Sequence, residues 1–382
     1  MYGLTTEELA RYNRHLILKE FGLEGQQKLK SAKVLVIGAG GLGAPCLLYL
    51  TAAGVGTIGI VDFDTVDASN LQRQVLYTVD DVGKPKADTA AHRLKQLNPS
   101  VHFNTHREKL TSANALDIIR SYDIIADGSD NFQTRYLVND ACVLLNKPLI
   151  YASIFQFEGQ VSVFNYTDPS GTLGPNYRDL FPTPPPPGMV PSCAEGGVLG
   201  VLPGIIGSMQ ASEAIKVITG IGTPLSGKLF LWNALTFESR TMKFKRDPAN
   251  PINGLQQTIT ALIDYEVFCG ISEPEKQTGG EISPAELKHW IDTGKDFQLI
   301  DVRESFEYGI CNLGGTLIPL AQIMQESARI AQNKPVVVHC KMGGRSAKAI
   351  AQLRTLGFDN LINLRGGIIA YAETVDPSLA KY

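Results

Sequence analysis

Short runs of aliphatic and β-branched residues alternate with longer mixed segments over the first 165 residues. Each run has the length and composition of a strand buried in a parallel sheet, and each intervening segment has the length of a helix. The predicted strands are 33–37, 57–61, 101–105, 123–126, 148–152 and 160–165. This alternation predicts a doubly wound α/β fold that binds ligands at the carboxyl ends of its strands.

Two flanking segments show other patterns. Residues 229–246 alternate apolar and polar side chains, which is typical of antiparallel strands and predicts that the sheet is mixed. Residues 5–30 are amphipathic and predict helix, with Thr5 or Thr6 as a cap. Arg11 and Arg14 fall on one face of that helix, and their spacing alone indicates a solvated basic face.

The composition changes after residue 246. Residues 247–280 contain several X-Pro pairs and a Gly-Gly pair, which are typical of a linker. Beyond it, Ser283 and Glu286 have the spacing of a capping box, and residues 297–304 and 335–340 predict buried strands. We therefore predict a large domain at 1–246, a linker at 247–280 and a smaller α/β domain at 281–382.

The composition narrows the possible environments and partners. The 382 residues have a net charge of −3, which gives no reason to expect a nucleic acid or an anionic membrane as partner. The charged N-terminus is unlike a signal peptide, and no apolar run reaches the roughly 18 residues of a membrane span. The scattered cysteines form neither a disulfide framework nor a C-x-x-C metal set. We expect a cytoplasmic protein with reduced thiols.

A glycine-rich turn follows the first predicted strand. Gly38, Gly40 and Gly43 have G-x-G-x-x-G spacing, and an apolar helix is predicted directly after them. Such a turn lets a phosphate approach the backbone at a helix N-terminus. Asp62 ends the next strand, where a carboxylate can bind a ribose hydroxyl. This pattern predicts a Rossmann-like nucleotide site without identifying the nucleotide.

Charged residues near the same strand ends favour a triphosphate. Arg73 and Lys86 follow the strand that ends at Asp62, and both are cations suited to phosphates. Asp127 and Asp130 end a further strand, and a carboxylate there is a candidate magnesium ligand. The alternative for these two aspartates is a loop built from turn-forming residues.

Five motifs in this region, RYNRHL, GAGGLG, DFDTVDASNLQRQ, VGKPKAD and DGSDN, occur in one order between residue 8 and about residue 245. The combination resembles the adenylating enzymes of the MoeB and ThiF type, which activate ubiquitin-like and sulfur-carrier proteins. The resemblance implies ATP and magnesium as cofactors, Asp130 as the magnesium ligand, and a homodimer in which Arg14 reaches the phosphates of the opposite subunit. The ATP-binding residues predicted from the glycine motif and this resemblance are Gly38, Gly40, Gly41, Gly43, Asp62, Ser69, Asn70, Leu71, Gln72, Arg73, Lys86, Asp130 and Asn131.

Residues 166–192 contain four successive prolines and predict an extended loop beside the active site. Cys193 follows this loop, just before an apolar helix predicted at 199–219. The residues alone leave open a small buried cysteine; the resemblance implies a thiol that forms a covalent adduct with the activated carrier.

The sequence departs from the same family at its structural zinc site. MoeB and ThiF usually bind zinc through two C-x-x-C pairs. Here Asn176 and Asp179 occupy the first pair of positions, and Glu266 and Cys269 occupy the second. A structural zinc needs four nitrogen or sulfur ligands, so we predict that no zinc binds there.

The predicted strand at 335–340 ends in Cys340, and the loop CKMGGRS follows it. Backbone N–H groups in such a glycine-rich loop form a nest that stabilises a thiolate or persulfide. Cysteine phosphatases need five residues between cysteine and arginine, whereas four separate Cys340 from Arg345. The smaller loop suits a sulfur atom.

That loop, together with IDVRE and LRGGIIAY, resembles the rhodanese-type sulfurtransferases over about residues 281–382. The resemblance implies that Cys340 carries a persulfide and that Arg303 and Arg345 bind an anionic sulfur donor. Cys311 stands where the common pattern has histidine, and it is a second thiol that can react with Cys340.

The two resemblances together predict an adenylyltransferase fused to a sulfurtransferase. The expected substrate is a small ubiquitin-like carrier ending in Gly-Gly, which is adenylated and then converted to a thiocarboxylate, as in molybdopterin synthesis. The expected sulfur donor is thiosulfate or a cysteine desulfurase. A nicotinamide oxidoreductase, a scaffold with an inactive rhodanese module and a phosphatase remain as alternatives.

Overall fold

The computed structural model describes residues 3–186, 196–270 and 280–382, and it divides the chain into two compact units, Met1–Ser272 and Glu273–Tyr382. Each unit contains one sheet. Residues 247–270, which were predicted as linker, belong to the first unit.

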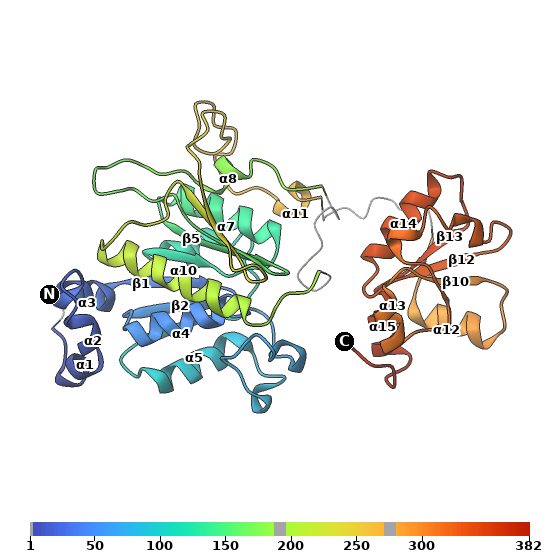
Figure 1. Ribbon diagram of the computed structural model, residues 1–382, viewed down its shortest axis with the longest axis horizontal. Helices are drawn as coiled ribbons and strands as arrows, with labels where there is room; N and C mark the ends of the chain where they lie inside the picture. The colour runs from blue at the N-terminus through green and yellow to red at the C-terminus, as the bar shows by residue number, and fades with distance from the viewer. Residues whose placement is uncertain (1–2, 187–195, 271–279) are drawn as a thin grey trace. The chain divides into compact units, whose positions relative to one another are not determined.

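The first unit is built on an eight-stranded mixed sheet with the order β3-β2-β1-β4-β5-β6-β7-β8. Figure 1 labels β1, β2 and β5 of this sheet. The first five strands in this order are parallel, and the last three pair antiparallel, which confirms the predicted mixed α/β sheet. The strands are β1 (Lys33–Ile37), β2 (Thr57–Val61), β3 (His102–His106), β4 (Ile124–Asp127), β5 (Leu149–Phe155), β6 (Glu158–Phe164), β7 (Lys228–Asn233) and β8 (Ser239–Lys243).

Helices cover both faces of this sheet, because β1 has apolar side chains on both sides that must be buried. Val34 and Val36 face one hydrophobic core, and Leu35 and Ile37 face the other. The first core includes residues of α3 (Gly22–Ser31), α4 (Gly43–Ala53), α5 (Lys86–Leu97) and α10 (Leu202–Thr219). The second includes residues of α6 (Ala115–Arg120), α7 (Phe132–Leu144), α8 (Tyr177–Leu180) and α11 (Tyr265–Phe268). This layering leaves the carboxyl ends of the parallel strands open to a ligand.

The N-terminal segment is helical, but it forms three helices: α1 (Thr6–Arg11), α2 (Asn13–Leu16) and α3. Thr5 caps α1 in a capping box with Glu8, as one of the two predicted caps. The break falls at Tyr12, whose buried hydroxyl accepts a hydrogen bond from Asn98 Nδ2 at 2.8 Å. This contact is remote in sequence, so the helical pattern of residues 5–30 does not reveal the break.

A buried polar cluster attaches residues 247–270 to the first unit. The guanidinium of Arg178 donates two hydrogen bonds of 2.8 Å to the carboxylate of Asp140. Tyr265 Oη donates to the same carboxylate at 2.8 Å. All three side chains are buried, and removing one partner from such a cluster leaves the others unsatisfied. The cluster therefore fixes α11 against α7 and α8.

The second unit has a five-stranded parallel sheet with the order β11-β10-β12-β13-β9. Ser283 and Glu286 form the predicted capping box at the start of α12. The elements are β9 (Glu281–Ile282), α12 (Pro284–Asp292), β10 (Gln298–Asp301), α13 (Ser305–Ile310), β11 (Thr316–Leu317), β12 (Val336–His339), α14 (Gly344–Arg354), β13 (Leu361–Leu364) and α15 (Gly367–Thr374). In the described part of the chain, every helix is too short or too polar to cross a membrane.

The substitution Tyr265→Phe should lower the free energy of unfolding of the first unit by about 2 kcal/mol, because it removes one hydrogen bond to a buried charged group. Thermal or urea denaturation of the full chain measures this change. Val267→Ala alters an exposed residue of the same helix and serves as the control. Equal stability of the two variants would show that Tyr265 does not hold this segment in place.

Candidate functional sites

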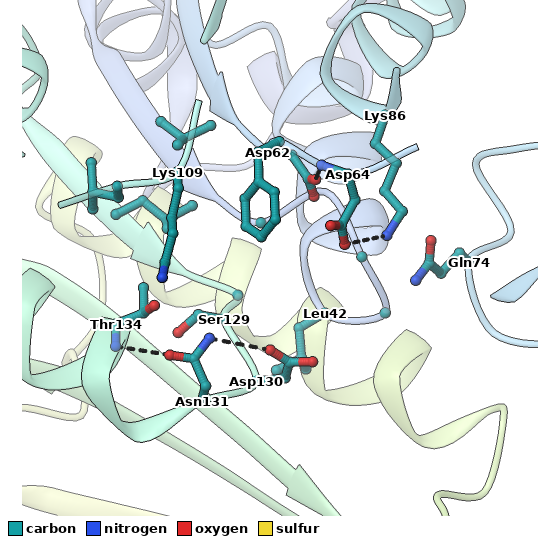
Figure 2. Close-up of a pocket in the computed structure, with 18 of the residues that line it drawn as sticks. Leu42, Asp62, Asp64, Gln74, Lys86, Lys109, Ser129, Asp130, Asn131 and Thr134 are labelled. Atoms are coloured by element: carbon teal, nitrogen blue, oxygen red, sulfur yellow. Dashed lines mark hydrogen bonds and ion pairs between the residues drawn. The ribbon is translucent and has the colours of Figure 1, made fainter. Parts of the chain in front are cut away.

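The carboxyl ends of β1, β2 and β4 surround a cavity of about 390 Å³ (Figure 2). The turn from β1 to α4 forms one wall of it. Gly38 has a φ of +84°, which favours glycine, and a Cβ at Gly43 would lie 1.8 Å from the Gly38 carbonyl oxygen. These two glycines therefore bring the N-terminus of α4 to the cavity edge, where its free N–H groups suit a phosphate.

Asp62, at the end of β2, fixes this turn. Its carboxylate accepts hydrogen bonds from the N–H of Ala39 at 2.8 Å and the N–H of Asp64 at 2.9 Å. Burial raises the pKa of Asp62, while these two hydrogen bonds and Lys86 oppose the rise. One carboxylate oxygen holds the glycine turn and the other holds the start of the next loop, so Asp62 shapes the cavity.

Two predicted cations line the cavity. Lys86 begins α5, is only 5% exposed, and its Nζ lies 3.1 Å from Asp64 Oδ2 (Figure 2). Arg73 is partly exposed, and its Nη1 lies 3.5 Å from the carbonyl oxygen of Ser69. Asp64 therefore balances the charge of Lys86 in a pocket that has room for a phosphate chain.

Asp130 and Asn131 lie across the cavity from Lys86 (Figure 2). Asn131 is the N-cap of α7 and accepts a hydrogen bond from the N–H of Thr134 at 2.9 Å. Its Nδ2 lies 3.4 Å from Asp130 Oδ1, and Asp130 is exposed. Magnesium is usually bound through one or two carboxylates together with substrate phosphates, so this carboxylate fits the ion's chemistry. Within the described ranges, no cluster of three or more acidic, histidine or cysteine side chains forms a metal site by itself.

The structure brings together most of the predicted nucleotide residues. Those that line the cavity are Gly38, Gly40, Gly41, Asp62, Asn70, Arg73, Lys86, Asp130 and Asn131. Predicted residues outside the lining are Arg14, Gly43, Ser69, Leu71 and Gln72. Arg14 is exposed on α2, and Cys193 lies outside the described residues.

Several lining residues were not predicted: Phe63, Asp64, Gln74, Lys109, Ser129, Thr134, Arg135, Ile154 and Val198. Phe63 and Asp64 directly follow a strand that was predicted, so their positions were a usable signal. Ile154 and Val198 come from remote segments, and only the tertiary structure places them here.

Three of the four positions of the family's zinc site are engaged in other contacts, and the fourth is a buried cysteine. Asn176 caps α8 and is buried, and Asp179 accepts a hydrogen bond from Asn250 Nδ2 at 2.7 Å. Glu266 pairs with Lys109 at 2.7 Å, and Cys269 is a buried free thiol. One thiol with two carboxylates and an amide is not the ligand set of a structural zinc.

In the second unit, Cys340 lies between β12 and α14 at the carboxyl end of the sheet. It is 1% exposed, and its Sγ accepts a hydrogen bond from the N–H of Gly343 at 3.1 Å. Gly343 has a φ of +99°, which directs that N–H into the loop. The Ser346 hydroxyl lies 3.4 Å from the same sulfur. The single proton of that hydroxyl has a closer acceptor in Asn363 Oδ1 at 2.7 Å, so the Gly343 N–H is the donor that stabilises negative charge on the sulfur.

The N-terminus of α15 is hydrogen-bonded to the backbone of the Cys340 loop. The N–H of Ile368 donates to the Cys340 carbonyl at 2.9 Å, and the N–H of Ile369 donates to the Lys341 carbonyl at 3.2 Å. A Cβ at Gly367 would lie 2.5 Å from both carbonyl oxygens, so this close approach needs glycine. The LRGGIIAY motif thus fixes the loop's conformation.

The structure contradicts the prediction that Arg303 binds the sulfur donor. Its guanidinium is fully buried and is bonded to both Asp301 carboxylate oxygens, the Glu307 and Cys311 carbonyls and Tyr382 Oη. All five N–H groups have acceptors, so Arg303 is a structural residue. Arg345 is partly exposed and forms a two-pronged ion pair with Glu307 at 2.6 and 2.8 Å.

The fold and the two sites define a class: an α/β nucleotide-binding unit joined to a unit built around a cradled cysteine. The chain belongs to the ThiF family, which matches residues 12–252, and a rhodanese-like domain matches residues 283–374. It is therefore an adenylyltransferase and sulfurtransferase of this family, as the sequence motifs predicted.

Named relatives cover both units. The chain is 50% identical, over its whole length and 97% of the relative, to the probable adenylyltransferase/sulfurtransferase MoeZ of Mycobacterium tuberculosis. A sulfur carrier protein adenylyltransferase of Thermus thermophilus is 57% identical, over 70% of this chain and 98% of the relative. A crystal structure of E. coli MccB with ATP shares the fold of the first unit, with a TM-score of 0.56 and 24% identity over 64% of this chain and 74% of MccB.

The substitution Lys86→Met should raise the Kd for ATP by about tenfold or more, because it removes a charge-assisted contact to a phosphate. Isothermal titration calorimetry on the full chain measures this change. Lys84→Met, two residues earlier at a 58% exposed side chain, is the matched control. A Kd unchanged by Lys86→Met would exclude this lysine from the nucleotide site.

Proposed function

We propose that the chain adenylates the C-terminal carboxylate of a small ubiquitin-like sulfur carrier ending in Gly-Gly and converts it to a thiocarboxylate. One observation supports both halves of the reaction: a single chain combines a cation-lined nucleotide cavity with a cysteine whose sulfur accepts a backbone N–H. The relatives named for both adenylyltransferase and sulfurtransferase activity span the same two units.

In the first step, an oxygen of the carrier carboxylate attacks the α-phosphorus of ATP, and pyrophosphate leaves with the bonding electrons. Positioning and charge neutralisation supply most of the catalysis in such a transfer. Arg73 and Lys86 would neutralise the phosphates, while Asp62 keeps the glycine turn in place. Asp130 would hold magnesium, which would supply further positive charge to the phosphates.

In the second step, the terminal sulfur of a Cys340 persulfide attacks the carbonyl carbon of the acyl-adenylate, and AMP leaves. This forms an acyl disulfide between carrier and Cys340. A thiol then attacks the Cys340 sulfur, so that the carrier leaves as the thiocarboxylate and a disulfide forms on the enzyme. An external thiol is our candidate for that attack, and a second external thiol then reduces the disulfide to restore Cys340. Cys193 remains our candidate for the covalent adduct with the activated carrier that the family resemblance implies.

We also propose the assembly and the cellular setting. The enzyme acts in the cytoplasm as a homodimer in which the exposed Arg14 of one subunit reaches the phosphates bound by the other. The donor of sulfur is thiosulfate or a cysteine desulfurase, and the thiocarboxylate serves molybdopterin synthesis or a related pathway. These points rest on the family resemblance.

The substitution Asp130→Ala should abolish carrier-dependent ATP–pyrophosphate exchange, because it removes the proposed magnesium ligand. Transfer of sulfur from thiosulfate to cyanide should be unchanged, since Cys340 belongs to the other unit. Asp117→Ala, at an exposed position of α6, is the control for both assays. Exchange that survives in the Asp130 variant would reject its role.

The substitution Cys340→Ala should leave pyrophosphate exchange intact and stop thiocarboxylate formation from thiosulfate. Mass spectrometry of the carrier detects the replacement of oxygen by sulfur. Cys311→Ala, at the partly exposed thiol of the same unit, distinguishes the two cysteines. If the Cys340 variant still modifies the carrier, the rhodanese-like unit has a function other than sulfur transfer through this residue.

A further inference from the structure

Glu307 is a buried charged residue next to the Cys340 loop that none of the steps above uses. It lies on α13, and it is 5% exposed. Its carboxylate accepts two hydrogen bonds from Arg345, one from the N–H of Glu304 at 3.0 Å and one from Tyr382 Oη at 3.0 Å. Burial alone would raise the pKa of Glu307, but these donors and the charge of Arg345 lower it to about 2. Glu307 is therefore a carboxylate at any physiological pH.

Tyr382 connects this carboxylate to the rigid part of the unit. Its hydroxyl accepts a hydrogen bond from Arg303 Nη1 at 2.5 Å and donates to Glu307. Arg303 is itself immobilised by the buried carboxylate of Asp301. The ring of Tyr382 lies 4.7 Å from Nζ of Lys341, the residue after Cys340. Tyr382 thus contacts both the Glu307–Arg345 pair and the Cys340 loop.

Two cations at this loop already have partners: Arg345 pairs with Glu307, and Lys341 lies over the ring of Tyr382. Arg345 presents two parallel N–H groups to Glu307, and this two-pronged geometry is the one that an oxyanion would also use. Arg345 lies in the first turn of α14, at the end of the loop that begins at Cys340, and the hydroxyl of the next residue, Ser346, lies 3.4 Å from the Cys340 sulfur. A small anion that approaches Cys340 must compete with Glu307 for Arg345.

We propose that Glu307 determines donor specificity at Cys340: its carboxylate occupies Arg345 and disfavours small oxyanionic sulfur donors such as thiosulfate. Tyr382 is a positioning residue that holds this carboxylate in place. Donors that present sulfur without an oxyanion, such as the persulfide of a partner protein, avoid this competition. The inference rests on the proposed role of Cys340 as the residue that carries sulfur.

The first test measures steady-state transfer of sulfur from thiosulfate to cyanide by the full chain. Glu307→Gln keeps the shape and an acceptor oxygen but removes the charge, so the KM for thiosulfate should fall about fivefold while kcat changes less than twofold. Glu373→Gln removes one exposed charge from α15 of the same unit and should leave KM unchanged. An unchanged or increased KM in the folded Glu307 variant would overturn the proposal.

A second variant covers the case in which Glu307→Gln does not fold. Tyr382→Phe removes only the hydroxyl that holds Glu307 and keeps the ring beside Lys341. The KM for thiosulfate should fall in the same direction by a smaller factor. Tyr308→Phe removes a hydroxyl that bonds the Gly315 carbonyl from the same helix as Glu307, and it should have no such effect. Equal KM values for the two tyrosine variants would exclude a positioning role for Tyr382.

The rate of Cys340 alkylation does not depend on catalytic turnover, so it tests the effect of Glu307 separately from the role of Cys340 in catalysis. The rates at which iodoacetate, an anion, and neutral iodoacetamide alkylate Cys340 are compared by peptide mass spectrometry. Glu307→Gln should raise the ratio of the anionic to the neutral rate by about fivefold. An unchanged ratio would reject the competition for Arg345. A raised ratio in an enzyme that shows no Cys340-dependent transfer would instead reject the proposed function and leave the charge effect standing.

Discussion

The hydrogen bond from the Ala39 N–H to the Asp62 carboxylate fixes the conformation of the glycine turn in the first unit. The nucleotide site depends on this bond, because the turn forms one wall of the cavity. The bond joins the β1–α4 turn to the residue that follows β2, at the edge of the cavity. In the second unit, peptide N–H groups of α15 fix the conformation of the Cys340 loop by donating hydrogen bonds to the carbonyls of Cys340 and Lys341. Both sites therefore use main-chain groups whose orientation is set from a neighbouring element.

The two sites also share a way of managing charge. Lys86 is paired with Asp64, and Arg345 is paired with Glu307. A buried cation without a partner is costly, so each unit supplies a carboxylate where the substrate's negative charge would otherwise be needed. The difference lies in exposure: the side chain of Asp64 is 52% exposed and can give way to phosphates, whereas that of Glu307 is 7% exposed and is tied to Tyr382. The nucleotide site is thus poised to exchange partners more easily than the thiol site.

Local patterns predicted the parts of the fold that depend on neighbours in sequence. The β1 strand, the glycine turn, the carboxylate of Asp62 and the capping box at Ser283 were all visible in this way. The break at Tyr12 was not, and the hydrogen bond that the Tyr12 hydroxyl accepts from Asn98 comes from a residue remote in sequence. The X-Pro pairs of residues 247–270 indicated a linker, yet the burial of Tyr265 attaches this segment to the first unit. Arg303 was misjudged for a related reason: an arginine after a strand serves either a ligand or an ion pair, and only burial distinguishes them.

The cluster of Asp140, Arg178 and Tyr265 has a consequence for an enzyme that handles reactive sulfur. The zinc site that the resemblance to MoeB and ThiF implies would fasten this region with thiolates, which attack persulfides and are readily oxidised. Here a carboxylate, a guanidinium and a phenol do the fastening, and none of the three forms a disulfide or exchanges sulfur. The fastening of α11 is chemically inert toward the sulfur that the other unit delivers.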